Sequence, residues 1–152
     1  MKTLARPRDT AEILERLLAL GPQSRRRWGR MSAHQAVCHL LDSFRFAVGE
    51  RPAHAAPIFV ERTVVKWIAL YAWVKWPAGI VTAPEVDSER GGTRPADFAG
   101  DLAELAALVE RFAAGPLRLD ALVHPVFGRM SESAWLRWGY LHADHHLRQF
   151  GA

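Results

Sequence analysis

Four amphipathic segments with helix start and stop signals constrain the fold of this chain more than any other feature. In these segments apolar residues recur at the spacing of a helix face, and no alternating apolar pattern, which a β-strand would need, has any length. The predicted helices begin at Asp9, Ser32, near Asp97 and at Ser131, and the first three end at Gly21, Gly49 and Gly115. The pattern therefore predicts an all-α protein built as a four-helix bundle.

Two of the predicted helix starts carry a pair of residues at capping-box spacing. These pairs are Asp9 with Glu12 and Ser32 with Gln35, in which two side chains would satisfy free backbone N–H groups. The apolar stripe of the first helix is formed by Leu14, Leu17 and Leu18. We expect that stripe to face the core of the bundle.

Length and composition agree with one folded domain over residues 1–152. Hydrophobic residues make up 49% of the chain and charged residues 24%, which is enough apolar material to bury a core. The single cysteine excludes an intrachain disulfide framework, and the first residues lack an apolar stretch long enough for a signal peptide. Both features predict a cytoplasmic protein.

The long connection between the second and third bundle helices has two parts. Residues 57–80 are rich in tryptophan and aliphatic residues, and charges interrupt them often enough to argue against a membrane span. We expect an extra helix there, lying across the bundle or at a homodimer contact, with a membrane-surface helix as the alternative. Residues 82–95 have the composition of a loop, and we expect this loop to cover the mouth of the site described next.

Three histidines lie close together near the end of the chain. His142 and His146 are four residues apart, so on a helix they share one face and can bind the same divalent metal ion. His145 falls on the edge of that face and is expected beside the ligands or at the rim. Gln149, one turn beyond His146, is placed to orient an imidazole or a bound water.

A metal site needs at least one further ligand. The candidates are His34, His39, His54, His124, Cys38 and the carboxylates. On the second helix His39 faces inward, and if this helix runs antiparallel to the last one, its imidazole reaches the same height as the other two. His34 projects the other way and would lie about a turn and a half too shallow. His39 is therefore the predicted third ligand.

Two of the other candidates, His124 and Cys38, have simpler interpretations. His124 precedes Pro125, where a helix is disfavoured, so we expect it in a loop, as a turn residue or as a rim residue near the metal. Cys38 lies about 100° from His39 on the helix and is expected to be a small buried residue rather than a nucleophile.

These residues resemble a known family. One histidine on the second helix and a His-x-x-x-His pair on the last resemble the DinB-like superfamily of metal-binding four-helix bundles, found mainly in bacteria. The strings HPVFG at 124–128 and HHLRQF at 145–150 are similar to a branch known as a domain of unknown function. The resemblance implies His39, His142 and His146 as ligands. Characterised relatives include transferases and isomerases that use the metal to activate a low-molecular-weight thiol.

Two classes of function fit these features. The first is a metal-dependent hydrolase or thiol-dependent transferase, in which three imidazoles hold zinc or nickel, or else iron or manganese, and an open position takes a small-molecule substrate or a thiol. The second is a non-catalytic stress-response or binding module whose metal or histidine cluster is structural. A third interpretation has no metal and buries the histidines as neutral hydrogen-bonding groups.

The net charge of +4 raises the question of nucleic acid. Arg25 to Arg27 form the only basic run, and neither zinc-finger spacing nor an aromatic RNA-binding motif is present. We therefore expect no nucleic-acid partner and interpret the three arginines as a solvated connection between helices, with attraction of an anionic substrate or thiol as the alternative.

Overall fold

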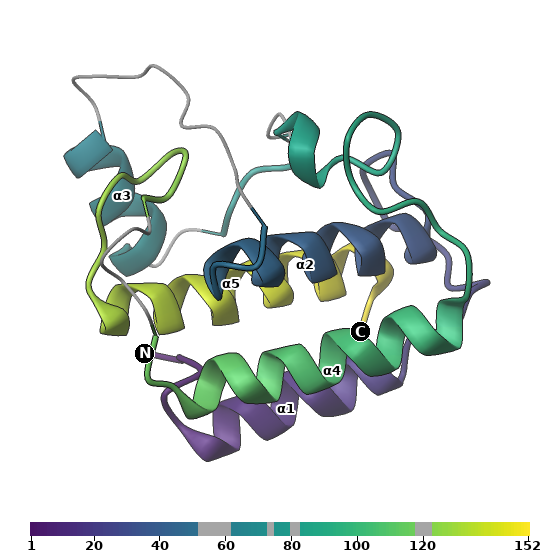
Figure 1. Cartoon of the computed structure of the whole chain (residues 1–152), viewed down its shortest axis with the longest axis horizontal. Helices are drawn as coiled ribbons and strands as arrows, with labels where there is room; N and C mark the ends of the chain where they lie inside the picture. The colour runs from purple at the N-terminus through teal and green to yellow at the C-terminus, as the bar shows by residue number, and fades with distance from the viewer. Residues whose placement is uncertain (52–61, 73–74, 80–82, 118–122) are drawn as a thin grey trace.

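The computed structural model describes residues 1–51, 62–72, 75–79, 83–117 and 123–152 (Figure 1). In these residues the helices are α1 (Pro7–Leu18), α2 (Ala33–Ala47), α3 (Arg62–Tyr71), α4 (Phe98–Ala114) and α5 (Glu132–Phe150), with a short 3₁₀ helix η1 (Pro84–Val86). No strand occurs among them, and the bridge between His124 and Gly128 stands alone. The all-α prediction is confirmed for the part of the chain that the structure describes.

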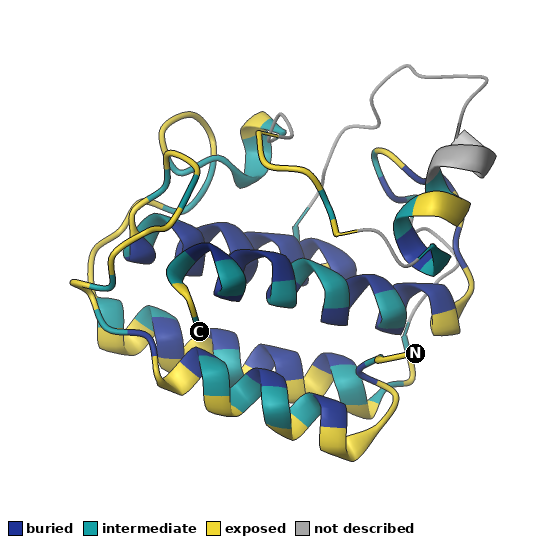
Figure 2. Cartoon of the chain, turned by 180° about the vertical axis from the view of Figure 1, so that it is seen from behind, coloured by how far each residue is buried: buried dark blue, intermediate teal, exposed yellow. Residues whose placement is uncertain are grey.

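The four long helices share one apolar core. Helix α2 packs against α4 and α5, and α1 packs against the same two helices from the other side. Figure 2 shows buried residues where the four helices face each other, and exposed residues mainly on the outer faces of α1 and α4. Helices α2 and α5 run antiparallel (Figure 1), and the Arg27 N–H donates to the Gln149 carbonyl at 2.7 Å, which ties the entry of α2 to the end of α5.

Helix α2 begins and ends where the sequence predicts. The Ser32 side chain accepts from the Gln35 N–H, and the Gln35 side chain accepts from the Ser32 N–H, so both halves of the capping box are present. At the other end Gly49 has a φ of 80°, and the Glu50 N–H reaches back to the Arg45 carbonyl, which is a Schellman arrangement. The Ser131 and Asp97 side chains likewise cap α5 and α4.

Two details of the first helix were predicted wrongly. Helix α1 begins at Pro7, because proline fixes φ and needs no N–H partner at the first helical position. Asp9 therefore lies inside the first turn, where its carboxylate accepts from the Thr3 N–H at 2.9 Å. Leu17 is buried as expected, but Leu18 is 64% exposed.

The tryptophan-rich connection contains the extra helix that the sequence predicts. Helix α3 packs against α5, and the Arg137 side chain donates to the Leu70 carbonyl at 2.9 Å. Trp76 follows it and donates its indole N–H to the Ala69 carbonyl at 2.8 Å. Trp73 and residues 57–61 lie outside the described residues. None of the described helices combines the length and the apolar character that crossing a membrane requires.

The segment from residue 83 to 95 is tied to α2 by a buried carboxylate. Asp42 is fully buried, and its oxygens accept from the Thr93 N–H at 2.6 Å, the Thr93 hydroxyl at 2.7 Å and the Arg51 guanidinium at 2.7 Å. The predicted loop is thus mostly irregular but includes η1, which packs against α2. Asp42 thereby joins Thr93, near the end of this segment, to α2.

Candidate metal centre

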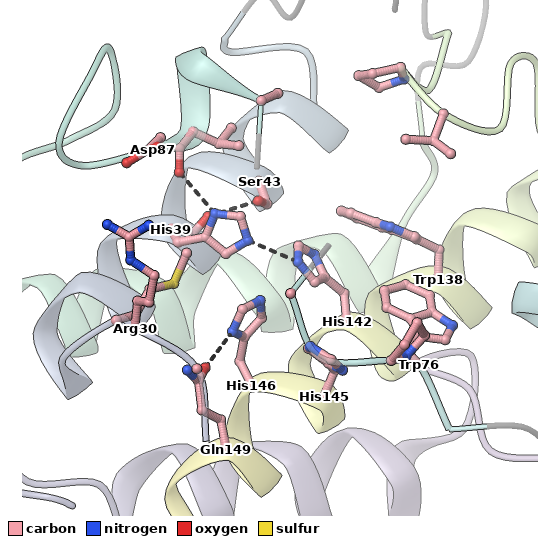
Figure 3. Close-up of a pocket in the computed structure, with 18 of the residues that line it drawn as sticks. Arg30, His39, Ser43, Trp76, Asp87, Trp138, His142, His145, His146 and Gln149 are labelled. Atoms are coloured by element: carbon pink, nitrogen blue, oxygen red, sulfur yellow. Dashed lines mark hydrogen bonds between the residues drawn. The ribbon is translucent and has the colours of Figure 1, made fainter. Parts of the chain in front are cut away.

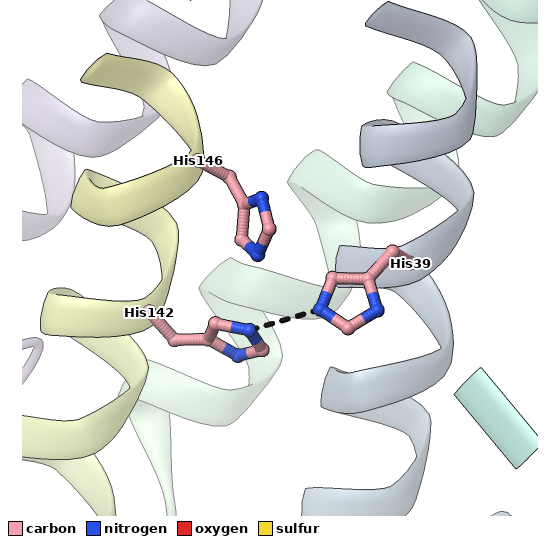
Figure 4. Close-up of side chains that lie close together, drawn as sticks. All are labelled: His39, His142 and His146. Carbon is pink, nitrogen blue, oxygen red and sulfur yellow. Dashed lines mark hydrogen bonds between the residues drawn. The ribbon is translucent and has the colours of Figure 1, made fainter. Parts of the chain in front are cut away.

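The structure brings together His39 from α2 and the pair His142 and His146 from α5. One ring nitrogen of each lies within 4.8 Å of the other two, and the Nε2 atoms of His39 and His142 are 3.1 Å apart (Figure 4). His39 and His146 are 6% and 8% exposed, and His142 is partly buried. These three side chains can hold one metal ion.

The second ring nitrogen of His39 fixes the way its imidazole points. Nδ1 lies 2.8 Å from the carbonyl oxygen of Val86, at the end of η1. Because a carbonyl oxygen only accepts, Nδ1 must carry the proton, and Nε2 then presents a lone pair toward the other two histidines. A backbone carbonyl behind a metal-binding imidazole is a common way to orient it.

A chain of contacts orients His146 in the same manner. Its Nδ1 lies 3.1 Å from Oε1 of Gln149, whose Nε2 donates to the Trp28 carbonyl at 3.0 Å. Since that carbonyl can only accept, the amide orientation is fixed, and Nδ1 of His146 carries the proton. Gly29 makes room for the amide: its φ is 80°, and a Cβ there would overlap Gln149 Nε2. Gln149 thus lies where the sequence places it, against a histidine.

His142 is the one member of the cluster without a second partner. Its Nδ1 is buried and makes no hydrogen bond, whereas Nε2 faces Nε2 of His39. Because His39 Nε2 carries a lone pair, this contact needs the proton of His142 on Nε2. A cation that accepted all three lone pairs would move that proton to Nδ1 and replace the single contact by three bonds. The donor set therefore fits a divalent ion.

Burial keeps the cluster neutral. It lowers the pKa of His39, and it lowers the pKa of His142 and His146 well below the usual value, with the neighbouring histidines adding to the effect. A neutral imidazole is the form that binds a metal, because protonation occupies the lone pair. The three side chains are thus in the binding-competent state at neutral pH.

The cluster opens onto a pocket of about 860 Å³ (Figure 3). Aromatic rings form much of its wall, among them Trp28, Trp76, Phe127 and Trp138. Residues of the segment from 83 to 90 form another side of the pocket. A small molecule in this pocket would meet aromatic rings and the imidazoles of the cluster, together with charged side chains such as Arg30 and Glu89.

His145 and His124 line the pocket but lie outside the cluster. The His145 ring is 6% exposed, lies edge-on to Trp28 at 4.7 Å, and leaves Nδ1 without a partner. Burial lowers the pKa of His145 to about 4. Nδ1 of His124 accepts from the N–H groups of Val126 and Phe127, both at 3.1 Å, so His124 is a turn residue. Burial lowers the pKa of His124 to about 3.

The remaining candidates fall elsewhere. His34 pairs with Asp101 of α4, and the buried Cys38 lies beside the same carboxylate, on a different face of α2 from His39. Burial, with Asp101 nearby, raises the pKa of the Cys38 thiol to about 12. Sequence reasoning missed this group, although the four-residue spacing of His34 and Cys38 was available as a signal. His54 lies outside the described residues.

Fold and site together define a helical protein in which a buried cluster of three histidines, able to hold a metal ion, faces an aromatic pocket. The chain belongs to the family described as protein of unknown function (DUF1569), whose model matches residues 6–152. No curated protein matches the chain, and neither does a solved structure.

Proposed function

We propose that this protein is a metal-dependent enzyme acting on a small molecule, built on a DinB-like four-helix bundle. His39, His142 and His146 would hold one divalent transition metal ion, zinc or nickel first and iron or manganese next. The observation that carries the proposal is the convergence of the three imidazoles, two of them with their second nitrogen fixed by an acceptor.

An open coordination position favours catalysis over a purely structural metal. Structural zinc sites are usually closed by four protein ligands, whereas catalytic sites keep one position for water or substrate. Among the described residues the cluster has three donors, and it borders the pocket. A ligand entering from the pocket would reach the metal directly.

The reaction class follows from what such a metal supplies. When bound, the ion lowers the pKa of a water or thiol and polarises an electrophile, which serves either hydrolysis or thiol transfer. The chain's own residues provide the setting: Val86 and Gln149 hold two imidazoles in place, and the aromatic wall excludes water from a bound substrate. A low-molecular-weight thiol is the co-substrate that the DinB-like resemblance implies.

One observation favours the second candidate, a binding module braced by its histidine cluster. The carboxylates nearest the site in the two histidine-bearing helices are both committed to arginines: Asp42 pairs with Arg51, and Asp144 pairs with Arg16 and Arg148. Neither is free to act as a general base. The metal would then have to activate its ligand without a carboxylate from either of these two helices.

Cobalt substitution distinguishes these candidates. The metal-free protein is titrated with Co²⁺, and the visible bands of nitrogen-ligated Co²⁺ are recorded before and after adding azide or a small thiol. An open site gives bands that the His142→Ala variant lacks and that shift when azide or thiol binds. His145→Ala is the matched control, because His145 lines the pocket outside the cluster.

Each outcome of this titration decides between the proposals. Bands that are lost in His142→Ala but do not respond to azide or thiol would show a closed, structural site. Absence of visible bands that depend on His142, even with excess Co²⁺, would overturn the metal proposal. Equal loss in His145→Ala would show that the ligands have been assigned wrongly.

A further inference from the structure

A second group of metal-binding residue types lies between α2 and α4. His34 and Cys38 are four residues apart on α2 and therefore share one face, and Asp101 comes from the first turn of α4. Oδ2 of Asp101 is 2.7 Å from Nε2 of His34 and 3.6 Å from Sγ of Cys38. One nitrogen, one sulfur and one oxygen atom thus meet within 4.8 Å of one another.

We propose that His34, Cys38 and Asp101 form a second metal site, which takes Zn²⁺ or an ion of similar softness and cross-links α2 to α4. A thiolate, an imidazole and a carboxylate are ligand types that zinc accepts, whereas the sulfur disfavours magnesium and calcium. The thiolate and the carboxylate together carry two negative charges, which balance a divalent ion. The thiol proton leaves to solvent when the ion binds.

The distances from Asp101 to the other two donor atoms can be compared with those of a tetrahedral zinc site. Bonds of about 2.1 Å to nitrogen and oxygen and about 2.3 Å to sulfur place ligand atoms about 3.4 to 3.6 Å apart. The Cys38–Asp101 separation of 3.6 Å already has this value. The His34–Asp101 contact of 2.7 Å has to open by about 0.7 Å, which a small rotation of either side chain provides.

The surroundings combine a buried ligand with a route for the ion. Cys38 is fully buried, whereas the side chains of His34 and Asp101 are each 18% exposed. An ion can therefore enter from the solvent side, and a water can complete its coordination there. Without a metal, the His34–Asp101 hydrogen bond could still hold the two helices together. That hydrogen bond alone does not explain why the sulfur of Cys38 lies beside the same carboxylate oxygen.

This site shares no ligand with the three-histidine cluster. Because only this site contains a sulfur ligand, spectroscopy can distinguish metal bound here from metal bound to the three histidines. Binding of Co²⁺ to a thiolate gives an intense sulfur-to-metal charge-transfer band in the near ultraviolet, which a site with three imidazoles cannot give. We expect wild-type protein titrated with Co²⁺ to show this band and Cys38→Ala to lack it. The visible bands that depend on His142 should remain in Cys38→Ala.

Substitution of the other two ligands completes the test. His34→Ala and Asp101→Asn should each lower the Co²⁺ affinity measured by the charge-transfer band at least about 10- to 100-fold. Loss of a residue that only supports a metal ligand already costs this much, and loss of a ligand should cost no less. Glu104→Gln is the matched control, because Glu104 also joins α4 to α2, through Arg45, but lies outside the group. It should leave the band unchanged.

Two results would overturn this proposal. The first is a wild-type protein that shows no charge-transfer band with excess Co²⁺ and whose thiol absorbance does not change with Zn²⁺ or Cd²⁺. The second is a band that persists at full affinity in both His34→Ala and Asp101→Asn, which would mean that Cys38 binds the ion without them. The wild-type spectrum decides the first point even where a variant fails to fold.

Discussion

Burial of His124 makes the stability of the fold depend on pH in a direction that can be calculated. The side chain is 8% exposed and stacks on Phe127, and burial lowers its pKa from 6.5 to about 3. In the unfolded chain the same imidazole takes up a proton below about pH 6.5, but in the folded protein it stays neutral. Between these two pKa values the unfolded state binds more protons, so stability falls as the pH falls.

The size of the effect follows from the two pKa values. On going from pH 7 to pH 5, His124 alone should reduce the free energy of unfolding by about 2 kcal/mol. The matched variant is His124→Asn, whose side-chain oxygen can still accept from the N–H groups of Val126 and Phe127 but does not titrate. The variant lacks the packing of the ring at both pH values. The stability lost for this reason therefore cancels when the change in free energy of unfolding between the two pH values is compared.

Urea denaturation at both pH values, with a chelator present so that metal binding does not contribute, measures this difference. Wild type should lose about 2 kcal/mol more stability than His124→Asn between pH 7 and pH 5. The other buried histidines also lower the stability as the pH falls, but they do so equally in wild type and in the variant. Equal losses in the two proteins would refute the reasoning, because they would show that His124 takes up its proton in the folded state as readily as in the unfolded chain.

Two further predictions concern the supports of the site. Asp42→Ala removes the buried acceptor of Thr93 and should lower the free energy of unfolding by about 3 kcal/mol; a loss under about 1 kcal/mol in urea denaturation would contradict the role given to it. Gly29→Ala should weaken metal binding about 10- to 100-fold by displacing Gln149, measured by competition with a chelator. Gly49→Ala is the control, because Gly49 has the same φ of 80° but a Cβ there would meet nothing. This variant should leave metal affinity unchanged, and an equal loss of affinity would argue against the Gln149 explanation.

Helix boundaries were predictable where local chemistry decides them. Ser32 with Gln35 and Ser131 are caps that act within one turn, and the structure has both helices starting there. The start of α1 was mispredicted, because Pro7 at the first helical position outweighs the capping-box spacing of Asp9. Local sequence thus identified the elements but not every boundary.

The proximity of the three histidines was also predictable, for a geometric reason. His142 and His146 share a face by spacing alone, and His39 reaches them because α2 and α5 run antiparallel with matching depth. Contacts between segments far apart in the sequence were not accessible in this way. Asp42 meets Thr93 across 51 residues, and His34 meets Asp101 across 67, with no periodic pattern linking them.

The central claim is that His39, His142 and His146 bind one metal ion together. Elemental analysis of the untagged, dialysed protein tests it most directly, beside His39→Ala, His142→Ala and His146→Ala, with His145→Ala as the control. We expect each of the three variants to contain one equivalent of transition metal less than wild type, and the control to match wild type. Wild-type protein without metal after reconstitution with zinc, nickel or manganese, or variants with the same content as wild type, would contradict the account.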